Sequence, residues 1–267
     1  MKLIPFAWLA LLLVIALLTP VFAPYDPTAV NPAQSLTAPS SQYLLGTDLL
    51  GRDVYSRLLW GTRRTLGMAL LAILVTAVPG AALGLAAGSA GEGWESWLMR
   101  GLEVALALPQ LLIALVIVAA LGQSPWAVGL AVGAAGIASF ARLARSTVQQ
   151  VRGQAYVQAA EALGMAPAQI VLRHVLRNIA GPLAAFTTIH FAWAILNTAT
   201  LSFLGFSGSP AAPDWGTMLN EGRAYLVTAP WVSAAPGAAI TLTVLAVNTL
   251  GGAWGEGRHR RDYNTVG

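Results

Sequence analysis

YVQAAEALGMAPAQIVLRHVLRN, residues Tyr156 to Asn178, is a polar stretch between segments that are apolar enough to lie in a lipid bilayer. It begins with small residues of high helix propensity, among them Ala159 and Ala160. Gly164 can end a helix in the left-handed conformation, and Pro167 suits the first turn of a new one. The stretch therefore predicts two short helices joined at a glycine.

The second of these helices is predicted to be amphipathic. Its apolar residues recur at i and i+4 along one side, and its polar residues lie elsewhere around the helix. The apolar set is Val171, Val175 and Ile179, with Leu172 and Leu176 beside them, and the polar set is Arg173, His174 and Arg177. An amphipathic helix packs its apolar side against another surface, so this hairpin is a candidate docking site.

A DNA-binding helix-turn-helix has a similar spacing and is the alternative interpretation. Its recognition helix would need polar side chains at its N-terminal end to reach the bases. Residues 166–171 supply little beyond Gln169 for that purpose, and the surroundings are apolar. We therefore expect no nucleic acid partner.

The composition places the chain in a membrane. Of its 267 residues, 56% are hydrophobic and 10% are charged, and the mean hydropathy is +0.65. A soluble globular protein usually has about 25% charged residues. The net charge of +4 does not indicate nucleic acid binding, because the basic residues cluster at the edges of the apolar segments.

The residue inventory excludes several kinds of site. The chain has no cysteine, so disulfides, cysteine nucleophiles and cysteine metal sites are excluded. Its only lysine is Lys2, and a Walker A loop needs a lysine to reach the phosphates of a nucleotide. We predict no catalytic residue, no cofactor and no metal ligand. If ATP drives this protein, another chain hydrolyses it.

About six apolar segments predict an all-α membrane protein. An apolar helix of about 20 residues crosses a hydrocarbon core of about 30 Å. The segments are Leu3 to Phe22, Thr65 to Ser89, Leu102 to Gly122, Trp126 to Phe140, Leu183 to Leu204 and Trp231 to Ala253. The first could also be a signal peptide with a cleavage site at Val21-Phe22-Ala23, but the later spans favour an uncleaved first span.

The positive-inside rule predicts the orientation. With the N-terminus in the cytoplasm, ten basic residues lie inside, namely Lys2, Arg100, Arg142, Arg145, Arg152, Arg173, Arg177, Arg258, Arg260 and Arg261, and five lie outside, namely Arg52, Arg57, Arg63, Arg64 and Arg223. This predicts an N-terminal helix and external segment at 1–64, a transmembrane core at 65–253 with a cytoplasmic loop at 142–181, and a cytoplasmic tail at 254–267.

Few polar residues fall inside the predicted spans, and the main ones are Gln110, His190, Asn197 and Asn248. A pump or secondary transporter that moves protons or ions by its own chemistry usually has buried acids or paired charges there. We expect His190 to be a hydrogen-bonded packing residue. Glycines repeat at i+4 in the second and fourth spans and predict close helix packing, namely Gly80, Gly84 and Gly88, and Gly129 and Gly133.

GTDLLGRDVYSRLLWG, Gly46 to Gly61, precedes the second span. Asp48 with Arg52 and Asp53 with Arg57 fall at i and i+4, and Thr47 or Asp48 can cap a helix. These features predict an exposed, ion-paired surface helix.

The same stretch closely resembles the sequence before the second span in the permeases of dipeptide, oligopeptide and nickel importers, through Gly46, Thr47, Asp48, Gly51, Arg52, Asp53 and Arg57. The resemblance continues at Leu98-Met99-Arg100, at Glu103, where the family usually has aspartate, and at Pro109. It continues in the loop before the last span, at Leu201 to Gly205, Pro213 to Gly216, Asn220 to Arg223 and Ala229 to Trp231. That loop is turn-rich, and we expect Trp215 and Trp231 at the membrane interface.

The hairpin in turn resembles the cytoplasmic EAA coupling loop of ABC importer permeases. The residues that the resemblance assigns to coupling with an ATPase are Gln158, Ala159, Ala160, Gly164, Ile170 and His174. Gln158 stands where the family usually has an acid, Arg177 where a proline is common, and Gly251 to Gly255 replace an acidic ending.

The resemblance implies a C-type permease subunit of a peptide or nickel importer in the bacterial or archaeal inner membrane. Its implied partners are a homologous second permease, two ATPase subunits, an external solute-binding protein and membrane lipid. Transport would follow by alternating access, and peptides, nickel chelates and other small molecules remain open as solutes. The alternatives are a membrane scaffold or receptor subunit that moves no solute, and a secondary transporter.

Overall fold

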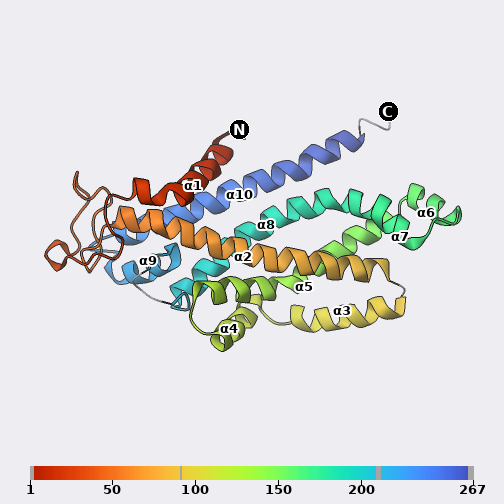
Figure 1. The fold of residues 1–267 in the computed structure, drawn as a ribbon, viewed down its shortest axis with the longest axis horizontal. Coiled ribbons are helices and arrows are strands. Elements are labelled where there is room, and N and C mark those ends of the chain that lie inside the picture. The colour runs from red at the N-terminus through yellow and green to blue at the C-terminus, as the bar shows by residue number, and fades with distance from the viewer. Residues whose placement is uncertain (1–2, 91, 209–211, 264–267) are drawn as a thin grey trace.

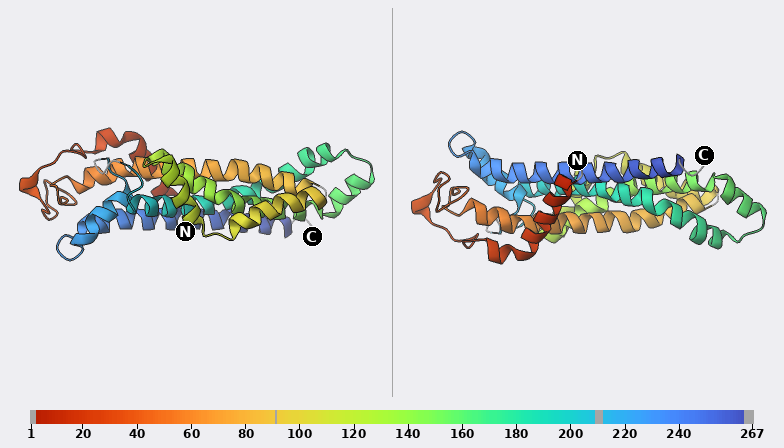
Figure 2. Two further views of the ribbon diagram at one scale, coloured as in Figure 1. Left: turned by 90° about the horizontal axis from the view of Figure 1, so that it is seen from below. Right: turned by 90° about the horizontal axis from the view of Figure 1, so that it is seen from above.

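The computed structural model describes residues 3–90, 92–208 and 212–263. Over these ranges the chain is an elongated bundle of helices with no β-strand (Figure 1). Most long helices run roughly along the long axis of the molecule. Residues 23–53 and α9 lie at one end, and α6 and α7 project from the other end in every view (Figure 2).

The helices follow one another along the whole described chain. They are α1 (Leu3–Phe22), α2 (Val54–Ser89), α3 (Glu92–Leu106), α4 (Gln110–Leu121), α5 (Pro125–Arg152), α6 (Ala155–Ala162), α7 (Pro167–Ile170), α8 (Leu176–Phe203), α9 (Trp215–Gly222) and α10 (Trp231–Tyr263). Short 3₁₀ turns cover Pro32–Gln34 and Arg223–Tyr225, and a π-helix at Val171–Val175 joins α7 to α8.

Five helical segments are long and apolar enough to cross a membrane, and a sixth span exists if α3 and α4 count as one bent pair. The prediction of an all-α membrane protein with about six spans is therefore confirmed. Lys2 and the end of the predicted tail, residues 264–267, lie outside the described residues.

The third predicted span is not one straight helix. Instead of a helix from Leu102 to Gly122, α3 ends at Leu106, α4 begins at Gln110, and the two are bent by 86°. Pro109 explains the break, because proline lacks an N–H for the helix ladder and disfavours helical geometry in the residue before it. The bend places Gln110 in the first turn of α4, inside the bundle.

The second span begins earlier than predicted. α2 starts at Val54 instead of Thr65 and continues to Ser89, so Arg57 lies within its first turns. Asp53 fixes this start, because its side chain accepts a hydrogen bond from the backbone N–H of Ser56. Similarly, α5 continues past Phe140 to Arg152 and carries the chain to the α6–α7 end.

The glycine repeats mark the contact between α2 and α5, as predicted. A Cβ atom placed on Gly133 would lie 2.6 Å from the Cβ of Val75, and one on Gly88 would lie 2.7 Å from the Cβ of Val148. Gly80, Gly84 and Gly129 are equally close to the facing helix. With no side chains between them, the two backbones approach closely along most of their length.

Two apolar clusters fill the interior. The larger joins α1, α2, α4, α5, α8, α9 and α10. The smaller lies under the α6–α7 end and consists of Val148, Val157, Ile170, Val175 and Ile179. Among the long apolar helices, α1 is the least buried, since only 11% of its apolar segment is buried in the bundle.

Candidate functional site

The polar hairpin, residues 155–175, contains the two short helices that the sequence predicts. α6 ends at Ala162, and Gly164 follows with a φ of +78°. The N–H of Gly164 donates to the carbonyl of Glu161 at 3.0 Å, and the N–H of Met165 donates to that of Ala160 at 3.1 Å. These bonds satisfy carbonyl groups at the helix end, as is usual when a left-handed glycine ends a helix. Pro167 then opens α7.

The buried side of the second helix differs from the predicted stripe. Leu172 and Leu176 are exposed, whereas Ile170, Val175 and Ile179 face the small cluster. The π-helix is the reason, because its i to i+5 period places Ile170 and Val175 on one side where a regular α-helix would not.

Five of the six residues assigned to coupling are either exposed or buried, and His174 is intermediate. Gln158, Ala159 and Gly164 are exposed, whereas Ala160 and Ile170 are buried in their own chain. His174 is half-buried, and its ring lies 5.9 Å from that of Tyr156, so it joins the second helix to α6.

Sequence reasoning missed the most exposed apolar side chain of the hairpin, that of Leu163, which is 88% exposed at the turn. Leucine before a helix-ending glycine usually indicates packing, so the pattern alone did not mark it. An ion pair of 3.1 Å between Arg152 and Glu161 connects the hairpin to the end of α5.

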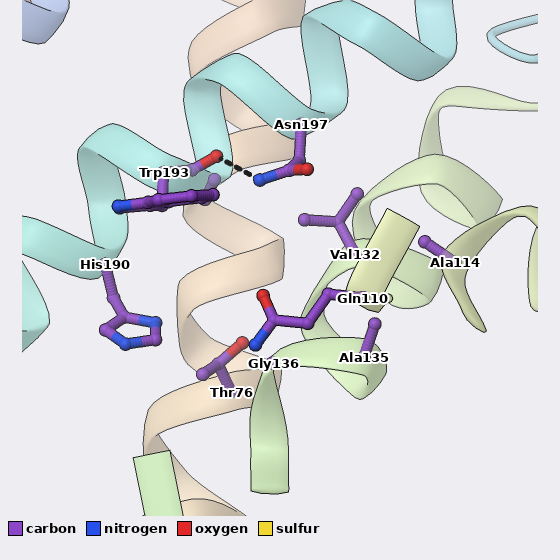
Figure 3. Close-up of a pocket in the computed structure, with 10 residues that line it drawn as sticks. Thr76, Gln110, Ala114, Val132, Ala135, Gly136, His190, Trp193 and Asn197 are labelled. Atoms are coloured by element: carbon purple, nitrogen blue, oxygen red, sulfur yellow. Dashed lines mark hydrogen bonds between the residues drawn. The ribbon is translucent and has the colours of Figure 1, made fainter. Parts of the chain in front are cut away.

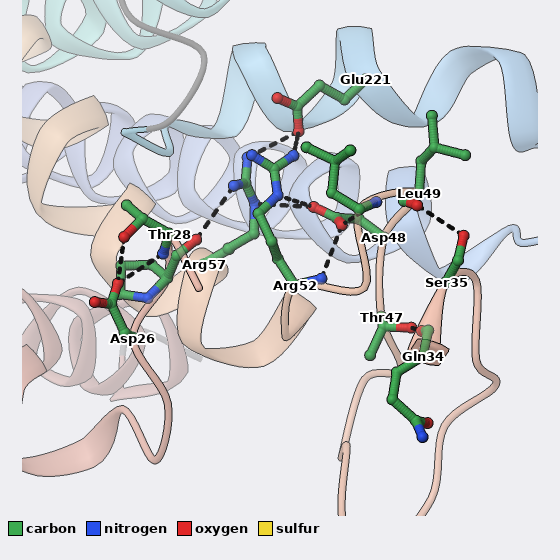
Figure 4. Close-up of polar contacts among 12 residues, drawn as sticks. Asp26, Thr28, Gln34, Ser35, Thr47, Asp48, Leu49, Arg52, Arg57 and Glu221 are labelled. Carbon is green, nitrogen blue, oxygen red and sulfur yellow. Dashed lines mark hydrogen bonds and ion pairs between the residues drawn. The ribbon is translucent and has the colours of Figure 1, made fainter. Parts of the chain in front are cut away.

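At the opposite end, a charge network joins Asp48, Arg52, Arg57 and Glu221 (Figure 4). Nε of Arg52 donates to Asp48 at 2.6 Å, and both arginines donate to the same carboxylate oxygen of Glu221 at 2.8 Å. Nε of Arg57 lies 3.5 Å from Asp48. Glu221 comes from α9, so the network ties the loop after α1 to the loop before α10.

The predicted exposed helix with two i, i+4 ion pairs is wrong. Asp48 and Arg52 do pair, but in a tight turn before α2, and Asp53 caps α2 instead of pairing with Arg57. Asp48, Arg52, Asp53 and Arg57 are all buried. The turn requires Gly51, whose φ is +70° and whose Cβ would collide with the backbone of Asn31. Gly46 and Thr47 complete it, and Thr47 forms an isolated bridge to Asp53.

The loop before α10 packs into the same end of the molecule. Asp214 caps α9 by accepting from the N–H of Thr217 at 3.0 Å. Trp215 is fully buried, and its indole N–H donates to the carbonyl of Leu58, so its side chain packs inside the chain and does not face lipid. The half-buried Trp231 donates to the carbonyl of Thr47 at 3.1 Å.

A third feature is a polar hollow between α2, α4, α5 and α8 (Figure 3). It brings together three of the four polar residues predicted inside the spans, namely Gln110, His190 and Asn197. None of the described residues that line it carries a charge. Its free space of about 20 Å³ holds one water molecule and no solute.

His190 is a packing residue, as expected, but without the predicted hydrogen bond. Its ring lies 4.3 Å from that of Phe186 and 5.6 Å from that of Phe140, and within the described part of the chain its side chain makes no hydrogen bond. Asn197 donates to the carbonyl of Trp193 on its own helix at 2.9 Å. The bend before α4 directs the amide of Gln110 toward Thr76 and His190 (Figure 3).

Comparison with known proteins gives one family. Residues 80–256 match the family described as binding-protein-dependent transport system inner membrane component. The chain is 38% identical over 250 residues to the di/tripeptide transport system permease protein DppC of Pseudomonas aeruginosa, which covers 91% of this chain and 82% of that protein. It is 39% identical over 243 residues to the glutathione transport system permease protein GsiD of Pectobacterium atrosepticum, covering 90% and 80%.

Proposed function

Because this chain belongs to the family of binding-protein-dependent inner membrane transport components, we propose that it imports short peptides or a related small solute as one of two permease subunits. The match over residues 80–256 carries this proposal, since that range includes the polar hairpin and every residue of the polar hollow except Thr76. The chain is a translocation subunit and not an enzyme. The match favours an importer over the scaffold and the secondary transporter, and ATP hydrolysis falls to two partner ATPase subunits.

The polar hairpin is the proposed contact with an ATPase. It projects beyond the ends of the spans, and it exposes Ala159, Leu163 and Leu172. Burial of the Leu163 side chain against a partner would be favourable, because a fully buried leucine stabilises a contact by about 1.5 to 3 kcal/mol. The neighbouring Gln158 offers an amide to the partner. We assign coupling to this exposed side, while Ala160, Ile170 and His174 hold its shape.

The polar hollow is the proposed position of the solute path. Its amide and imidazole groups can exchange hydrogen bonds with a peptide without holding a charge too tightly for release. Because the hollow admits only one water molecule in this conformation, passage requires the spans to move. ATP-driven movement of the hairpin would open it in alternating access with the second permease.

The charge-network end is the proposed external end. It exposes Leu44, Leu49 and Leu50 on the loop that the network holds in place, and these side chains would contact the solute-binding protein. The polar hairpin is then cytoplasmic, in agreement with the charge bias of the sequence.

Exchange of Ala159 for glutamate tests the assignment. Ala159→Glu adds a charge to the proposed contact without entering the core, so we expect the permease pair to assemble normally while the ATPases no longer co-purify and uptake of a labelled dipeptide stops. Ala38→Glu, the same change at an exposed site of the other end, is the matched control for ATPase co-purification and should leave it unchanged. Normal uptake and full ATPase recovery with Ala159→Glu would refute the coupling assignment.

A further inference from the structure

An open groove of about 640 Å³ lies between the first half of α2, the start of α5 and the segment before α9. Nothing in the proposed function uses it. Among the described residues, the charged side chains that line it are Arg63 and Arg64. The other lining residues are Trp60, Gly67, Met68, Pro125, Trp126, Ala212 and Pro213.

The positive charge of this groove has no acidic partner among the described residues. Arg63 is exposed and forms no ion pair there. Arg64 donates to the backbone carbonyls of Ala212 and Ser207, and its buried Nε has no partner. Asp214 is the acid closest in sequence to the lining, but Thr217 engages both of its carboxylate oxygens. The groove is therefore suited to an anion.

The start of α5 adds to the positive charge at the groove. Pro125 and Trp126 are the first residues of a helix of 28 residues, and the Ser124 side chain caps the N–H of Ala127. The N-terminus of a helix carries a partial positive charge that favours an anion beside it. Three positive features thus face one groove.

The apolar part of the groove indicates what carries the anion. Arg64 immediately precedes the apolar run of α2, and the side chain of Trp126 is 70% exposed. An exposed tryptophan beside a basic residue at the end of an apolar segment is typical of the level of the lipid headgroups. One step further into the membrane, Gly67 and Met68 line the groove, and a Cβ on Gly67 would meet nothing within 4 Å. This surface is open to an acyl chain.

We propose that the groove binds the phosphate headgroup of an anionic phospholipid, with an acyl chain over Gly67 and Met68. The exposed Arg63 contacts the phosphate, the Arg64 guanidinium held by the carbonyls of Ala212 and Ser207 adds its positive charge, and Trp60 and Trp126 flank the site. A free phosphate or a solute carboxylate shares the anionic chemistry, but neither would use the apolar floor.

The test measures lipid retention in the assembled permease complex, so its outcome is independent of transport. The complex is purified in mild detergent, the retained phospholipids are counted by native mass spectrometry, and dioctanoylphosphatidylglycerol is titrated by thermal shift. We expect Arg63→Gln to lose a retained lipid and to weaken the titration about tenfold or more. Arg63→Lys should restore part of the binding, whereas Arg223→Gln, the same change at another exposed arginine, should have no effect.

A second variant separates a lipid from a small anion. Gly67→Leu fills the floor and leaves both arginines in place, and leucine favours a helix more than glycine does. It should weaken dioctanoylphosphatidylglycerol and leave any response to inorganic phosphate unchanged. The lipid site is refuted if Arg63→Gln retains the same lipids as the unchanged protein. It is also refuted if inorganic phosphate or a dipeptide stabilises the complex as well as the lipid does, in a manner that depends on Arg63.

Discussion

Two neighbouring acids, Asp48 and Asp53, have different roles although the sequence pattern treats them alike. Asp48 balances two buried guanidinium groups, whereas Asp53 accepts a backbone N–H at the start of α2. Removal of one partner from a buried ion pair leaves an uncompensated charge, which costs about 3 to 5 kcal/mol. An asparagine at a helix N-cap is about as good as an aspartate.

The same substitution at the two positions should therefore give different results. We expect Asp48→Asn to lower the free energy of unfolding by about 3 kcal/mol or more, and Asp53→Asn by at most about 1 kcal/mol. Thermal unfolding of the purified protein in detergent measures both changes. Equal losses would show that Asp53 carries part of the ion pairing.

Local spacing predicts the partner of a residue only when the local structure is known. The i, i+4 rule for Asp53 and Arg57 assumes a helix through both, but α2 begins between them, at Val54. Glu221 is 169 positions from Arg52 in sequence, and no local pattern reports such a contact. The glycine at 164 was easier, because a left-handed backbone favours glycine whatever surrounds it.

At the scale of the elements, the turn of the polar hairpin requires glycine because of its backbone geometry and not because a side chain would lack room. Gly164 has a φ of +78°, and a Cβ there would meet nothing within 4 Å. Asparagine tolerates this geometry, but a β-branched residue does not. Gly164→Asn should thus keep ATPase co-purification and uptake, while Gly164→Val should lose both. If the two variants behave alike, the turn does not set the contact surface.

The glycine seam, the close contact between α2 and α5 at their glycines, depends instead on the absence of side-chain atoms between the two helices. Gly133→Ala would place its Cβ 2.6 Å from the Cβ of Val75, so we expect a loss of about 1 to 3 kcal/mol in the free energy of unfolding. Gly101→Ala in α3 is the matched control, because its Cβ would meet nothing within 4 Å and alanine favours a helix. Thermal unfolding compares the two, and an unchanged midpoint for Gly133→Ala would contradict the close approach.

Hydropathy was sufficient for the number of spans, and the spacing of the glycines was sufficient for the closely packed faces of α2 and α5. Hydropathy did not predict the bend before Gln110, since a bent span and a straight one have the same mean hydropathy. Pro109 was visible in the sequence, but proline is also tolerated inside transmembrane helices, as Pro79 in α2 shows. The polar hollow follows from that bend and was therefore missed as a group.

At the scale of the molecule, the orientation can be tested with single cysteines, because the natural chain has none. The predicted topology places Thr37 and Thr217 outside, but Thr217 is buried and bonded to Asp214. Val227, which is 95% exposed in the same loop, is the better site. An impermeant thiol reagent added to intact cells should label Val227→Cys and not Gln169→Cys. The reverse pattern would invert the proposed topology. Asn264, a further cytoplasmic candidate, lies outside the described residues.

The glycine seam also has a mechanical consequence. α2 has 36 residues and is thus about 54 Å long, and its close contact with α5 stiffens it against bending. A rigid helix that tilts about its middle moves both of its ends at once, so a tilt of about 10° displaces each end of α2 by about 5 Å in opposite directions. A displacement of about 5 Å at the hairpin end of α2 therefore gives an equal displacement at its opposite end. No helix has to unwind to transmit this movement.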